Sequence, residues 1–139
     1  MNTETELQSI LRHCRTVAVV GLSPKAHRDS YRVAQYMQAQ GWRIIPVNPS
    51  AAASEMPILG EKVHASLTEA AQHEKIDLVN VFRNSDDVPP VAQEAIAIGA
   101  RGLWLQLGVV HEAAAAQARA AGLWVVQDRC LKVEHARAS

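Results

Sequence analysis

The stretch Thr16-Val17-Ala18-Val19-Val20-Gly21 is a β-branched, apolar run that stops at a glycine, and a segment of helical period begins at Ser30. Four similar apolar runs follow, at 43–47, 77–82, 103–107 and 123–127. Runs of this kind that alternate with helical segments are typical of βαβ units, whose parallel strands are covered by helices on both faces. The sequence therefore predicts an α/β fold with a mostly parallel, five-stranded sheet.

The segments between the runs carry helix signals. Predicted helices cover 30–40, 66–73, 89–98 and 111–121, and Thr3-x-x-Glu6 reads as a capping box that opens another. A short run at Lys62-Val63 would add a sixth strand, and Ala51-Ala52-Ala53-Ser54 is expected to be a surface loop. We therefore expect residues 1–139 to form a single Rossmann-like, doubly wound domain.

Composition excludes several classes of function. The 139 residues carry 14 Lys and Arg against 14 Asp and Glu, and a neutral chain is not an electrostatic nucleic-acid binder. The first residues form no apolar signal region and no run is long enough to span a membrane, so we expect a cytoplasmic protein. Cys14 and Cys130 stand in no Cys-x-x-Cys motif, and the six histidines show no metal-ligand spacing. We predict neither a disulfide nor a metal site.

Polar residues follow each predicted strand, at the edge of the sheet where ligands of open α/β folds bind. The five strand ends read Gly21-Leu22-Ser23, Asn48-Pro49-Ser50, Phe82-Arg83-Asn84-Ser85, Gln106-Leu107-Gly108 and Asp128-Arg129-Cys130. Gly21 would let the backbone approach a phosphate, and the following helix would offer free N–H groups. From Arg12 to Arg43 there are six bases and one acid, a local net charge of +5. These features favour phosphate binding at this loop.

The loop departs from the usual dinucleotide fingerprint. That fingerprint is G-x-G-x-x-G, followed about 20 residues later by an acid that holds the ribose. Here the loop reads Gly21-Leu22-Ser23-Pro24-Lys25-Ala26, and Val47-Asn48-Pro49 supplies no acid after the second strand. A P-loop motif is absent as well. An ordinary NAD site is therefore not expected, although the basic loop would suit the 2′-phosphate of an NADP-type nucleotide.

Six segments of the chain form a recognisable set of motifs: 17–23, 30–34, 45–49, 77–83, 103–109 and 128–132. Together they resemble the small stand-alone CoA-binding proteins, which are similar to the CoA-binding domain of the succinyl-CoA synthetase alpha subunit. The resemblance covers about residues 10–135. The larger ligase uses a phosphorylated histidine, and no histidine of this chain lies in a matching motif. Its ligase activity is therefore not transferred.

The resemblance also implies a set of binding residues. Gly21, Leu22 and Ser23 would line the nucleotide phosphates, and Lys25 and Arg28 would meet the 3′-phosphate or the pyrophosphate. The other implied contacts are Val47, Asn48 and Pro49 beside the adenosine, Phe82, Arg83 and Val88 over the adenine, and Gln106, Leu107 and Gly108 near the pantetheine. No catalytic residue and no metal ligand is assigned.

We therefore expect non-catalytic binding of coenzyme A or acyl-CoA at the carboxyl ends of the strands, with the phosphates on the loop from Gly21 to Arg28. The expected partner is this small-molecule ligand. The sequence does not identify a protein to which the module would bring CoA. Two alternatives stay open. One is a small CoA-dependent acyl- or thiol-transfer enzyme that uses Cys130, and the other is an NADP-type nucleotide binder.

Overall fold

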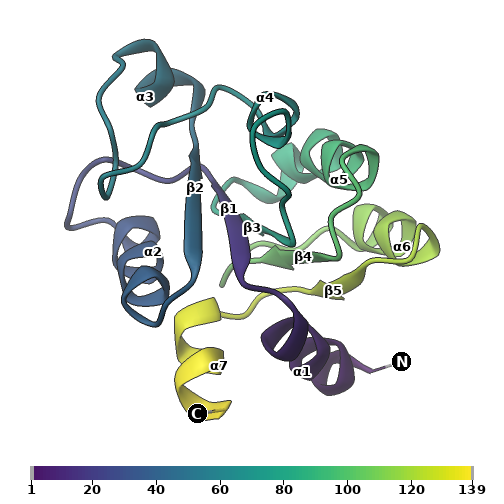
Figure 1. The fold of residues 1–139 in the computed structure, drawn as a ribbon. Helices are drawn as coiled ribbons and strands as arrows, with labels where there is room; N and C mark the ends of the chain where they lie inside the picture. The colour runs from purple at the N-terminus through teal and green to yellow at the C-terminus, as the bar shows by residue number, and fades with distance from the viewer. Residues whose placement is uncertain (1, 139) are drawn as a thin grey trace.

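Residues 2–138, which the computed structural model describes, form a sheet with helices on both faces (Figure 1). The strands are β1 (Thr16–Val20), β2 (Arg43–Val47), β3 (Leu78–Val81), β4 (Gly102–Leu105) and β5 (Trp124–Val126). The α-helices are α1 (Thr3–His13), α2 (Asp29–Ala39), α3 (Pro49–Ala53), α4 (Leu67–Ala71), α5 (Val88–Ala97), α6 (Glu112–Ala120) and α7 (Leu131–Ala138). A 3-10 helix, Ser85–Asp87, precedes α5.

The sheet has the order β2-β1-β3-β4-β5, and every neighbouring pair of strands is parallel. Its strands are buried on both faces, which is why they read as continuous apolar runs and not as alternating ones. In β1, Val17 and Val19 pack into the core under α1, α2 and α7, whereas Ala18 and Val20 pack under α4, α5 and α6. The predicted Rossmann-like α/β class and the five-stranded sheet are confirmed.

Two predictions about the segment after β2 are wrong. Lys62-Val63 does not form a sixth strand, and only an isolated parallel bridge joins Val47 to the neighbouring His64. The segment expected to be a loop at 51–54 is mostly helical, because α3 spans Pro49–Ala53. The Asn48 side chain caps this helix by accepting a hydrogen bond from the backbone N–H of Ala51.

The N-terminal helix has its N-cap one residue before the predicted one. Asn2 is the N-cap, and its side chain accepts from the backbone N–H of Thr5. Glu6 therefore does not complete a capping box, and its carboxylate is buried beside β5. The predicted cap at Ser66 is confirmed, since its hydroxyl accepts from the backbone N–H of Glu69. The sequence did not predict the C-terminal helix α7.

The strand order determines where a ligand can enter. The chain leaves β1 toward β2 on one side and reaches β3 on the other, so β1 and β3 are adjacent at the topological switch point. In open α/β sheets the crevice outside the carboxyl ends of such strands is the usual binding place. Among residues 2–138, no helix is both long and apolar enough to cross a membrane.

Candidate functional site

Gly21 follows β1 at the switch point, and no other residue type fits there without a shift of the backbone. Its φ is +88°, a left-handed conformation that glycine tolerates best. A Cβ atom at this position would lie 2.4 Å from the carbonyl oxygen of Phe82, which follows β3. The backbone N–H of Gly21 donates to the carbonyl oxygen of Val47 at 2.8 Å. The loops after β1 and β3 are thus in direct backbone contact.

The loop after Gly21 is held in place by two serine hydroxyls. The Ser30 hydroxyl accepts from the backbone N–H of Ser23 at 3.0 Å, and the Ser23 hydroxyl accepts from that of Lys25 at 3.1 Å. Arg28 is the N-cap of α2, and within residues 2–138 no side chain caps that end. The first N–H groups of α2 and its dipole therefore face the loop, as they do in anion sites at helix termini.

A cavity of about 430 Å³, here called the loop cavity, opens over this segment. Its lining residues are Gly21, Ser23, Lys25, Arg28, Asp29, Ser30 and Phe82. The cavity thus brings together four residues implied for phosphate binding and one implied for the adenine: Gly21, Ser23, Lys25 and Arg28, with Phe82. The volume lies at the lower end of the range usual for small-molecule sites.

A second cavity of about 810 Å³, here called the large cavity, lies over the carboxyl ends of β3 and β4 between α2 and α7. The implied residues Phe82, Arg83, Gln106 and Leu107 line it. Asn84 and Cys130, which the sequence placed at the strand ends where a ligand would bind, line it as well. Sequence reasoning assigned no binding role to the rest of the wall, which consists of Asp29, Arg32, Val33, Asp87, Val109, Lys132 and Val133. Asp29 and Phe82 line both cavities, so the two adjoin at these residues.

The bases counted between Arg12 and Arg43 do not form one cluster. Arg15 lies over the Trp42 ring, with 5.4 Å between its guanidinium carbon and the ring centroid, and Arg43 forms ion pairs with acidic side chains. Arg43 opens β2 and Arg15 directly precedes β1, so both lie at the amino ends of the strands. Only Lys25, Arg28 and Arg32 of the six line the two cavities, and the net charge of +5 overstates the local field there.

Other implied residues are buried in the fold. Leu22, Val47 and Val88 belong to the two core clusters and are at most 3% exposed. The Asn48 side-chain amide donates to the carbonyl oxygen of Leu22 at 2.9 Å while its oxygen caps α3. Pro49 lines a separate cavity of about 680 Å³ beside α3. None of these five implied residues lines the loop cavity or the large cavity.

The segment after β4 is held by side chains of other strands. The Gln106 side-chain oxygen accepts from the Asn80 amide at 3.2 Å and from the backbone N–H of Leu131 at 3.4 Å. The Asp128 carboxylate accepts from the backbone N–H of Gly108 at 2.7 Å. These bonds connect the carboxyl ends of β3, β4 and β5 beside the large cavity, which Gln106 lines.

Comparison with known proteins identifies the chain. Residues 15–136 match the profile of a protein family described as CoA binding domain. The chain belongs to this CoA binding domain family. It is 40% identical over 134 residues to the uncharacterized protein YneT of Bacillus subtilis (strain 168), and the match covers 96% of this chain and 95% of that protein. The family expected from the sequence is confirmed.

Solved structures of similar proteins have the same fold. Cell-free ID.343 from Thermus thermophilus is 34% identical and superimposes with a TM-score of 0.89 over all of both chains. A hypothetical protein from Pyrococcus horikoshii OT3 is 31% identical, with a TM-score of 0.88 over 99% of this chain and 92% of its own. The Rossmann-like architecture of this CoA binding domain is therefore shared along nearly the whole chain.

The two thiols of this CoA binding domain differ in their surroundings. Cys14 is fully buried, and burial, reinforced by the charge of Asp77, raises the pKa of its thiol to about 12. Cys130 is partly exposed and lines the large cavity near Leu107 and Val133. Cys130 is thus the thiol that a ligand in the large cavity can approach.

Proposed function

We propose that this protein binds coenzyme A or acyl-CoA without catalysing a reaction, with the phosphates on the loop from Gly21 to Arg28. The observation that carries the proposal is the loop cavity of a CoA binding domain. This cavity brings together Gly21, which has no room for a side chain, the bases Lys25 and Arg28, and the uncapped N-terminus of α2. The pyrophosphate and 3′-phosphate of CoA need such a concentration of N–H groups and positive charge.

Two further observations support CoA over a dinucleotide. After β2 the chain continues as Asn48-Pro49, so it lacks the acid that holds a ribose 2′-hydroxyl. The loop cavity adjoins the large cavity at Asp29 and Phe82, and the two together extend from the loop after β1 to α7. A ligand with phosphates at one end and a long, flexible arm fits this arrangement.

The proposal is tested by calorimetric titration with CoA, 3′-dephospho-CoA and NADPH at fixed salt. Lys25→Ala and Arg28→Ala are compared with Lys75→Ala, which removes an exposed base just before β3 at the opposite edge of the sheet. A charge-assisted contact of ordinary strength contributes roughly 1–3 kcal/mol. We expect this loss with either loop variant or without the 3′-phosphate, and no loss with Lys75→Ala.

The same titration contains the outcomes against the proposal. No heat with CoA together with a clear response to NADPH would indicate an NADP-type nucleotide binder. Equal weakening by Lys75→Ala and the loop variants would show that net charge, and not the loop, determines the affinity. Turnover of an acyl-CoA that Cys130→Ala abolishes, with affinity retained, would replace the non-catalytic function by an enzymatic one.

A further inference from the structure

The large cavity has an apolar part that the phosphates and bases of the proposed site do not use. Leu107, after β4, is 68% exposed, and Val133, in α7, is 47% exposed. Both line the large cavity, and the buried Val109 adds to the same wall. Exposed apolar side chains that gather at one cavity are typical of a ligand or partner surface.

The charges that line this cavity nearly balance. The Arg83 guanidinium lies 3.9 Å from the Asp87 carboxylate. The Lys132 ammonium lies over the ring of Tyr36, 5.7 Å from its centroid. Within residues 2–138, neither the Arg32 guanidinium nor the Lys132 ammonium forms an ion pair, and Asp29 lies three residues before Arg32 in the same wall. The three bases and two acids of this wall leave a net charge of only +1 beside its apolar part.

The apolar wall lies beyond the loop cavity along the path of the ligand. The loop cavity and the large cavity share Asp29 and Phe82, whereas Leu107 and Val133 belong to the large cavity alone. If the phosphates are on the loop, the pantetheine arm passes Phe82 and its sulfur end reaches this wall. The group attached to that sulfur is then the part of the ligand that covers Leu107 and Val133.

We propose, resting on the proposed function, that the preferred ligand is a CoA thioester with an uncharged hydrocarbon acyl group, which packs against Leu107 and Val133. Free CoA would leave both side chains in water. An acyl chain covers them, and each buried methylene strengthens binding by about fourfold. Affinity then rises with acyl length until the wall is covered.

The test is a calorimetric titration of the full chain with CoA and with acetyl-, butyryl-, hexanoyl- and succinyl-CoA. Partial burial of the four additional methylenes should make hexanoyl-CoA bind at least about tenfold more tightly than acetyl-CoA. Succinyl-CoA has the same number of acyl carbons as butyryl-CoA but adds a carboxylate. We expect it to bind more weakly, because the apolar wall would desolvate that charge.

Serine substitutions test the wall itself. Leu107→Ser and Val133→Ser change exposed side chains, so the fold should be retained, and the readout is the ratio of hexanoyl-CoA to acetyl-CoA affinity within each variant. We expect this ratio to fall at least about threefold in both, as expected when a few methylene contacts are lost. Met56→Ser and Val110→Ser are controls, because these residues are 65% and 40% exposed and do not line the large cavity. Their ratios should match the parent.

The outcomes separate this inference from the function on which it rests. If CoA binds and the affinity does not depend on acyl length, the inference is wrong and the proposed function stands. Tighter binding of succinyl-CoA than of butyryl-CoA would point to recognition of a carboxylate by Arg32 and would also overturn it. If no CoA derivative binds, both proposals are wrong.

Discussion

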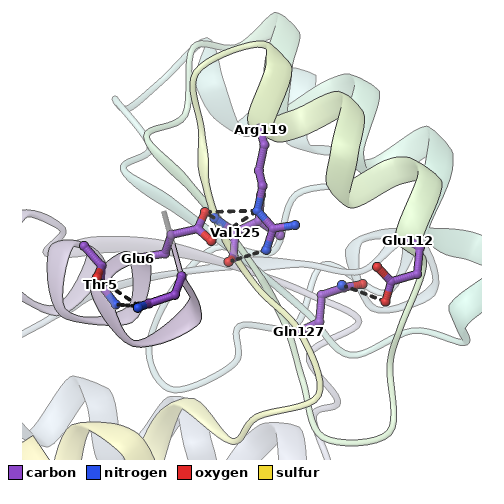
Figure 2. A network of polar contacts seen from close by, with 7 residues as sticks. Thr5, Glu6, Glu112, Arg119, Val125 and Gln127 are labelled. Atoms are coloured by element: carbon purple, nitrogen blue, oxygen red, sulfur yellow. Dashed lines mark hydrogen bonds and ion pairs between the residues drawn. The ribbon is translucent and has the colours of Figure 1, made fainter.

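The carboxylate of Glu6 in α1 accepts a hydrogen bond from the backbone N–H of Val125 in the edge strand β5 at 2.8 Å (Figure 2). The same carboxylate accepts from Arg119 Nε at 3.1 Å, and the Arg119 guanidinium donates to the carbonyl oxygen of Val125 at 3.3 Å. An edge strand exposes N–H groups that can pair with another chain. Here side chains from α1 and α6 occupy the backbone groups of Val125.

We expect Glu6→Ala to lower the free energy of unfolding by about 1–3 kcal/mol, because it leaves the buried N–H of Val125 without an acceptor. The Glu6 side chain is only 3% exposed, so water cannot replace the carboxylate without a rearrangement. Urea unfolding of the variant and the parent measures the difference.

Glu4→Ala is the matched control, since it removes a carboxylate from the same helix. Glu4 pairs with Arg129, but its side chain is 64% exposed. Exposed ion pairs contribute about 0–1 kcal/mol. An equal loss of stability in both variants would mean that net charge, and not the bond to β5, explains the effect of Glu6.

Most of the fold could be predicted because it depends on local patterns. The bounds of β1 and β2 match the predicted runs. β3 and β5 are one residue shorter than predicted at each end, and β4 begins one residue earlier and ends two residues earlier than predicted. These strands are buried on both faces, and such strands appear in the sequence as short, continuous apolar runs. In contrast, α3 is a short helix that the Asn48 side chain caps by accepting a hydrogen bond from Ala51. The run of three alanines did not indicate this hydrogen bond in the sequence.

The part of the candidate site that depends on local backbone geometry could be predicted from the sequence. The part formed by side chains from distant segments could not. Gly21 carries its own signal, because only glycine suits a strand end pressed against a neighbouring backbone. Arg32 and Lys132 come from α2 and α7 and share a cavity only after folding. Arg15 and Arg43 lie close to the loop in sequence, yet the fold places them at the amino ends of the strands, away from the loop. Charge counted along a chain does not show on which edge of a sheet it lies.

Stability should decrease in mild acid because of His135. Its Nδ1 lies 2.9 Å from the Tyr36 hydroxyl, and burial, followed by the charge of Arg15, lowers the pKa of His135 below its usual range. The unfolded chain binds the proton near pH 6.5, whereas the native state resists it, so the unfolding free energy falls as pH drops below about 6.5. Urea midpoints between neutral pH and about pH 5 should decrease less in His135→Gln than in the parent.

Tyr36→Phe serves as the control for that experiment. It removes the hydroxyl partner and leaves His135 of α7 half-buried, so it should lower stability at every pH and leave the dependence of stability on pH unchanged. If the urea midpoint of His135→Gln falls with pH as steeply as that of the parent, groups other than His135 cause the acid sensitivity.

Alkylation should distinguish the two thiols. In the native protein, iodoacetamide at mildly alkaline pH should label Cys130 and spare Cys14, because burial raises the Cys14 pKa to about 12 and keeps reagent away. Peptide mapping by mass spectrometry locates the label, and both thiols should react in denaturant. If CoA occupies the large cavity, saturating CoA should also slow the labelling of Cys130. Native labelling of Cys14 would contradict the packing of α1 against the sheet.

Gly21→Ala should impair both folding and ligand binding, and Gly41→Ala separates the two causes. Both glycines have φ near +90°, but a Cβ at Gly41 would meet nothing within 4 Å, whereas one at Gly21 would lie 2.4 Å from the carbonyl oxygen of Phe82. Backbone strain alone costs about 1–2 kcal/mol in either variant. The clash at Gly21 adds roughly 1–3 kcal/mol, because the loops after β1 and β3 must move apart.

The separation of these loops should also be visible in binding. The Gly21 backbone and the Phe82 side chain border the same loop cavity, so Gly21→Ala should weaken CoA binding at least about tenfold by displacing groups of its wall. Gly41→Ala, at the far end of α2, should bind as the parent does. Calorimetry below the unfolding transition of each variant makes the comparison. Equal stability and equal affinity in the two variants would show that the contact between Gly21 and Phe82 does not constrain the loop.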